Sequence, residues 1–149
     1  MSLFETVSSD IKSAMLAKDK VRLEALRGAK KEFLEAKTAK GAEGDLSDDA
    51  AVKILQKMVK QRKDSATIYQ EQNRPELAEK ELAEVGVLES YLPQQLSSDE
   101  LGKAIRDIIA QVGATSAKDM GKVMGVATKA LAGKTEGRLI SETVKKLLN

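Results

Sequence analysis

Apolar residues recur every three or four positions along almost the whole of this sequence, and nowhere do they alternate as in a half-exposed β-strand. The chain holds 2 prolines, Pro75 and Pro93, and both fall where that spacing is interrupted. Proline suits the first turn of a helix, but it cannot continue one because it lacks a backbone N–H. The pattern therefore predicts an all-α protein whose helices are separated near these two residues.

Four helices are expected before Pro93. They cover about residues 4–15, 20–39, 47–68 and 75–88. Ser2, Asp19 and Ser47 are candidate caps for the first three, because their side-chain oxygens can accept the free N–H groups of a first turn. The glycine-bearing residues 41–44 are expected to end the second helix.

Three shorter helices are expected after residue 96. Ser97 and Glu100 have the spacing of a capping box, and Gly113 is placed to end the helix that begins there. Residues 116–119 can cap the next helix, which is expected to end at Gly133, and Thr135 is the expected cap of the last. We therefore predict an N-terminal helical domain of about four helices, residues 1–92, and a small three-helix domain, residues 97–149.

The sequence contains no cysteine and no histidine. Disulfides, thiolate nucleophiles, imidazole bases and most zinc sites are therefore excluded. Residues 133–135 read Gly-Lys-Thr, but Thr128 stands where a phosphate-binding loop requires its first glycine. We expect no catalytic residue, no metal site and no cofactor. The chain is expected not to be an enzyme by itself.

The first residues become polar at once, without the basic and apolar regions of a secretory signal, and no apolar run is long enough to span a membrane. These features predict a cytoplasmic protein with no membrane partner. Two charged groups are expected to be solvated helix faces rather than sites. They are the mainly basic group Lys57, Lys60, Arg62, Lys63 and Asp64, and the acidic group Glu76, Glu79, Glu81, Glu84 and Glu89.

Residues 118–125, Lys-Asp-Met-Gly-Lys-Val-Met-Gly, place two glycines in one expected helix. Each glycine costs such a helix about 1 kcal/mol relative to alanine, so a reason for both is needed. On a helical wheel the apolar residues Met120, Val123, Met124, Ala127 and Leu131 share one side, whereas Lys118, Lys122, Gly125 and Lys129 share the other. Gly121 borders the basic side.

Gly125 therefore lacks a side chain on the basic face, which favours contact with a partner. For Gly121 two interpretations stay open: close packing of a neighbouring helix within the domain, or contact with a partner. Residues 97–149 hold nine basic and six acidic side chains, a net charge of +3, whereas the remainder carries −1. The C-terminal part thus has the positive excess that an anionic partner would require.

Three stretches together resemble the GatB/YqeY family, and in particular its small stand-alone members. They are residues 60–65 (Lys-Gln-Arg-Lys-Asp-Ser), 88–97 (Leu-Glu-Ser-Tyr-Leu-Pro-Gln-Gln-Leu-Ser) and 118–125. The resemblance covers nearly the whole chain, with Asn73 standing where a glycine is common. It implies a two-part helical fold related to the tail of the B subunit of the tRNA-dependent amidotransferase, a part that contacts tRNA.

The family label of a carbon–nitrogen ligase with glutamine as amido donor would then apply by descent only, because the amidotransferase chemistry belongs to other domains. The leading hypothesis is a non-catalytic tRNA-binding accessory module that contacts RNA phosphates. Its expected RNA-binding residues are Lys118, Lys122, Gly125, Lys129, Lys134 and Arg138, with Gly121 as a close-packing or contact glycine. The alternative is a helical adaptor that binds another protein, such as a tRNA synthetase or another translation protein.

Overall fold

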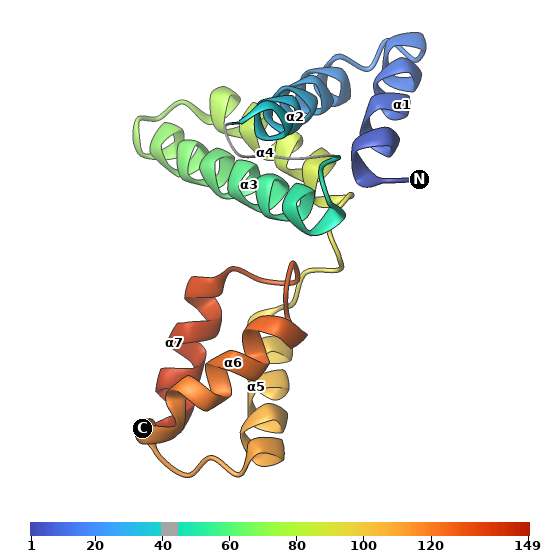
Figure 1. The fold of residues 1–149 in the computed structure, drawn as a ribbon. Coiled ribbons are helices and arrows are strands. Elements are labelled where there is room, and N and C mark those ends of the chain that lie inside the picture. The colour runs from blue at the N-terminus through green and yellow to red at the C-terminus, as the bar shows by residue number, and fades with distance from the viewer. Residues whose placement is uncertain (40–44) are drawn as a thin grey trace. The chain divides into compact units, whose positions relative to one another are not determined.

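The structure is a computed structural model that describes residues 1–39 and 45–149. The described residues form seven α-helices, one short 3-10 helix and no strand, which confirms the all-α prediction. The chain divides into two compact units, Met1–Leu92 and Pro93–Asn149 (Figure 1). The expected end of the second helix at residues 41–44 lies outside the described residues. That each unit folds on its own stays a prediction.

The first unit contains helices α1 (Leu3–Leu16), α2 (Lys20–Thr38), α3 (Asp48–Glu71) and α4 (Pro75–Glu89). The three predicted caps are confirmed, because Ser2, Asp19 and Ser47 accept hydrogen bonds from N–H groups in the first turns of α1, α2 and α3. Pro75 occupies the first position of α4, as expected. Asn73, in the turn before it, has a φ of 59°, which explains why glycine suits this position.

The core of the first unit is mainly aliphatic, and its largest fully buried side chains are those of Phe33, Leu26, Leu55, Leu88 and Val7. These side chains come from all four helices, so each helix contributes its apolar face to one centre. One residue of α2 at this packed interface is Gly28. A Cβ added there would lie 3.5 Å from the Arg62 Nη2 atom of α3.

The expectation that Arg62 and Glu84 lie on solvated faces is wrong. Glu84 is only 8% exposed, and its Oε1 atom lies 3.6 Å from Nε of the half-buried Arg62, so the pair joins α3 to α4. The other charged pairs on these faces, Lys60–Asp64 and Lys63–Glu89, are more exposed and agree with the expectation. The Arg62–Glu84 pair is therefore part of the interior.

Tyr91 ties the end of α4 to α1 and α2. Its hydroxyl group donates a 2.6 Å hydrogen bond to Asp10 Oδ2 and accepts a 3.0 Å bond from Arg22 Nη2. Arg22 also lies 3.6 Å from Asp10 Oδ2, so the three side chains form a closed polar set. Tyr91 belongs to the second of the three family-like stretches, and its role here is to hold helices together.

We predict that this set makes the protein sensitive to alkali. Burial, with the hydrogen bond to Asp10, raises the pKa of Tyr91 above its usual range. The folded state therefore favours the neutral phenol, and the contribution of Tyr91 to the free energy of unfolding is complete below about pH 10. As the pH rises further, this contribution falls by up to about 1.4 kcal/mol per pH unit. Urea unfolding between pH 8 and pH 11 measures the slope. The variant Tyr91→Phe should be less stable at neutral pH and should lose stability less steeply above pH 10; equal slopes would contradict the assignment.

The second unit contains α5 (Ser98–Val112), a 3-10 helix (Ala117–Asp119), α6 (Met120–Ala130) and α7 (Gly137–Leu148), around a core that includes Ile105, Val123, Ala127 and Val144. The predicted capping box of Ser97 and Glu100 is present, and Gly113 ends α5 with a φ of 70°. The unit begins at Pro93 rather than at residue 97. Gln95 explains this difference, since its Nε2 atom donates a 2.7 Å hydrogen bond to the Gly133 carbonyl.

Two predicted caps of the second unit are corrected. Ser116 caps the 3-10 helix that precedes α6, so the α-helix begins only at Met120. The cap position of α7 falls to Glu136, and Thr135, which is buried, lies one residue before it. Gly133 has a φ of 79° in the preceding turn, which agrees with its predicted place at the end of the α6 segment.

Candidate nucleic-acid interface

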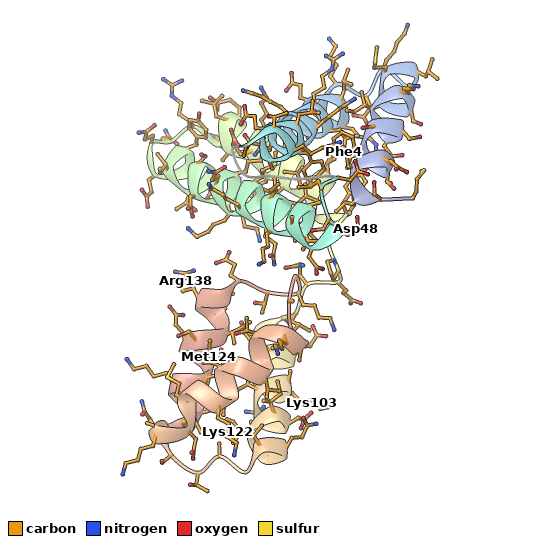
Figure 2. The ribbon with its side chains drawn as sticks, in the orientation of Figure 1. Phe4, Asp48, Lys103, Lys122, Met124 and Arg138 are labelled. Atoms are coloured by element: carbon orange, nitrogen blue, oxygen red, sulfur yellow. The ribbon has the colours of Figure 1, made fainter. Side chains whose placement is uncertain are left out.

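Helix α6 has the two faces that its sequence predicts. Val123 and Ala127 are completely buried in the core of the second unit, whereas Lys122, Gly125 and Lys129 are exposed. Met124 packs against the core, and Figure 2 shows it together with Lys122 on the same helix. The core packing therefore fixes which side of α6 is presented to solvent.

Neither glycine of α6 serves to admit a neighbouring helix. A Cβ atom added at Gly121 or at Gly125 would have no atom within 4 Å in the described structure, apart from chain neighbours and the backbone of α6 itself. Of the two interpretations of Gly121, close packing within the unit is therefore not supported, and contact with a partner remains. Both glycines leave bare backbone at the surface, where an external group can approach closely.

A shallow depression follows this bare backbone. It is lined by Gly121, Lys122, Gly125, Val126, Lys129 and Ala130. Val126, which is 38% exposed, was missed by the sequence analysis. Its spacing could have revealed it, because residues 122, 126 and 129 follow one line along a helix surface. The depression thus combines two lysine charges, bare backbone and one apolar side chain.

The structure does not bring all the predicted site residues together. Lys118 lies in the 3-10 helix before α6, and Lys134 lies in the turn after it, so both stand outside the depression. Arg138 projects from the first turn of α7, toward the other end of the unit from Lys122 (Figure 2). Its Nη2 atom is 3.7 Å from Glu136 Oε2, so its charge is partly neutralised.

The amino-terminal end of α7 is a poorer anion site than expected. Glu136 occupies the cap position, and although its side chain makes no hydrogen bond to the first turn, it brings a negative charge to this end of the helix. A phosphate there would meet a like charge. We therefore leave this helix end out of the candidate site and keep the exposed face of α6 as its centre.

The electrostatic surroundings of α6 are simple. Lys118, Lys122, Lys129 and Lys134 form no ion pair with any other described residue. One carboxylate that interacts with this face is that of Asp119, which accepts hydrogen bonds from the backbone N–H groups of Thr115 and Ser116. These bonds, with a smaller contribution from Lys122, hold the pKa of Asp119 below its usual range. It is therefore ionised at neutral pH, at the start of an otherwise basic face.

The sequence profile of the YqeY-like protein family matches residues 4–148. This chain belongs to the YqeY-like family. The match includes all three stretches that carry the resemblance and both structural units, so the family assignment concerns the whole fold.

Several similar curated proteins are fungal and carry one name, "Altered inheritance of mitochondria protein 41, mitochondrial". The protein from Meyerozyma guilliermondii is 37% identical over 81% of this chain and 64% of its own length. The protein from Kluyveromyces lactis is 34% identical over 57% of this chain and 45% of its own length. The protein from Vanderwaltozyma polyspora is 31% identical over 76% of this chain and 64% of its own length. The chain therefore spans less than two thirds of these relatives.

These names correct the predicted cytoplasmic location, since the relatives are named as mitochondrial proteins. The prediction was wrong because targeting segments are separate from the folded domain, so the polar residues that open the first helix carry no information about the compartment. In the part of the chain that the structure describes, no helix has both the length and the apolar character needed to cross a bilayer. The same part holds no group of three or more carboxylates placed to bind a metal ion.

Proposed function

We propose that this YqeY-like protein is a non-catalytic accessory module that binds tRNA through the exposed face of α6. The observation that carries the proposal is the pair of open glycines, Gly121 and Gly125, beside two unpaired lysines. Bare backbone lets a sugar–phosphate chain approach the helix closely, and lysines on either side attract its charge. Such contacts position RNA without reading its bases, so binding is expected to be similar for different tRNAs.

Lys122 and Lys129 would be the principal phosphate contacts, since both line the depression and neither is paired. Lys118 and Lys134, at the two ends of α6, would extend the contact, and Arg138 would contribute least because of Glu136. The proposal includes a relationship to the amidotransferase B-subunit tail, which the resemblance implies. We propose no amidotransferase activity for this chain, whose sequence offers no cysteine nucleophile and no histidine base.

A second candidate function is a helical adaptor that binds a protein, such as a tRNA synthetase, on the same face of α6. Val126 favours it, because an exposed valine beside two glycines suits close packing of another helix. The two candidates differ in their physical basis: phosphate contacts depend on charge, whereas a packed helix interface depends mainly on apolar area.

The salt dependence of tRNA binding by the purified full-length chain separates them. For the RNA-binding function we expect log affinity to fall linearly with log salt, with a slope of about −1 for each phosphate contact, hence about −2 or steeper. Filter binding or fluorescence anisotropy with two unrelated tRNAs gives the slopes and the ratio of affinities. If neither tRNA binds saturably at low salt, the proposal is contradicted and the adaptor becomes the better candidate.

A further inference from the structure

A groove between α1 and α2 lies in the first unit and has no part in the proposed RNA site. Its nonpolar contributors are Ile11 of α1 and Leu34 of α2, together with the side-chain stems of neighbouring charged residues. The charged lining residues all come from α2: Arg27, Lys30, Lys31 and Glu35. The groove thus joins apolar surface to a local excess of positive charge.

Leu34 is 43% exposed, although the residue before it, Phe33, is completely buried. The difference arises because α2 turns Leu26, Ala29 and Phe33 toward the core. Arg27, Lys31, Leu34 and Thr38 follow one another at three- and four-residue spacing along the other side. This outward line extends over about 16 Å, which is the length of three helical turns. No described residue covers it.

The charged side chains that line the groove are mainly basic. Arg27, Lys30 and Lys31 form no ion pair with any described residue, whereas Arg22 and Lys37 of the same helix pair with Asp10 and Asp45. Residues 1–92 together carry a net charge of −1. The groove lining therefore carries three cations and one carboxylate, Glu35, and a partner with carboxylates would complement this positive excess.

We propose that the α1–α2 groove binds an acidic amphipathic helix of a partner protein. The apolar stripe of such a helix covers Leu34 and Ile11, and its flanking carboxylates reach Arg27, Lys30 and Lys31. An RNA backbone would satisfy the cations but would bring no apolar group to cover Leu34. A bilayer surface would meet the exposed Leu34 but not Ile11, which is half-buried beside it. This site is independent of the RNA-binding proposal for α6.

The test uses the full-length chain and a synthetic helical peptide with leucines in one stripe and glutamates beside it. We expect saturable binding by fluorescence anisotropy, about tenfold weaker for Leu34→Ser and for Lys31→Glu. Leu82→Ser is a matched control, because Leu82 is also 43% exposed, and Lys53→Glu is the control for charge. Neither control variant should change the affinity. A peptide with lysine in place of every glutamate should not bind.

Three results would overturn the inference. The acidic peptide could fail to saturate the protein, or all four variants could bind it with equal affinity. Alternatively, phosphatidylserine vesicles or an RNA hairpin could bind in place of the peptide, with an affinity that Leu34→Ser and Lys31→Glu reduce. In that last case the groove would be a membrane or RNA site. None of these results bears on tRNA binding by α6, which the variants of that helix test separately.

Discussion

Replacing Lys122 and Lys129 together by glutamate is expected to weaken tRNA binding about a hundredfold near 0.1 M salt, since each lost phosphate contact removes about a factor of ten. The slope of log affinity against log salt should fall by about 2. Both side chains are exposed and unpaired, so the melting temperature should be nearly unchanged. Binding titrations at several salt concentrations, with two tRNAs, measure the effect.

The matched control is Lys103→Glu with Lys145→Glu, which changes the net charge equally on α5 and α7 (Figure 2 labels Lys103). It should lower the affinity only slightly and leave the slope unchanged, since long-range attraction is screened beyond about 10 Å at this salt concentration. Equal losses in the two double variants would mean that overall charge, and not the α6 face, determines binding.

Glu84→Gln is expected to have the largest effect on stability, lowering the free energy of unfolding of the first unit by about 2 kcal/mol. Removal of one partner from a buried ion pair leaves the other charge uncompensated, which costs several kcal/mol. The side chains of Arg62 and Glu84 are 21% and 10% exposed, so solvent screens the remaining charge and lowers the loss of stability below that of a fully buried pair. Urea unfolding followed by circular dichroism gives the value.

Asp64→Asn provides the control, because Asp64 forms an exposed ion pair with Lys60 on the same helix. Its cost should stay below about 0.5 kcal/mol. A double variant, Arg62→Met with Glu84→Leu, should recover most of the lost stability, since apolar residues of similar volume often replace a buried pair without cost. Our interpretation of the pair as interior is wrong if Glu84→Gln costs no more than Asp64→Asn.

The fold was predictable where the signals are local. Ser2, Asp19, Ser47 and Ser97 each accept an N–H group a few residues away, so the sequence spacing alone identifies them. Gly113 ends its helix by the same kind of local rule. The three- and four-residue spacing of apolar residues also predicted which residues of α6 are buried, because α6 packs against the core by one face.

Long-range packing was not predictable in this way. Arg62 and Glu84 look like surface residues in their own helices, and only the contact between α3 and α4 makes them a buried pair. Thr135 is the better cap by residue type, but in the folded unit it is buried and α7 begins one residue later, with Glu136 at the cap position. For the same reason the sequence could not show that Arg138 lies away from Lys122, since its position depends on where α7 packs in the unit.

The most direct test of the proposed RNA site is the tRNA affinity of Gly125→Leu compared with that of Gly86→Leu. Both glycines lie in helices, and an added Cβ would meet no atom within 4 Å at either position, so neither variant should lose stability. Only Gly125 lies in the α6 depression. We predict that Gly125→Leu binds tRNA about tenfold more weakly than the parent, as for a lost phosphate contact, while Gly86→Leu binds equally well. Parental affinity in Gly125→Leu would contradict the account.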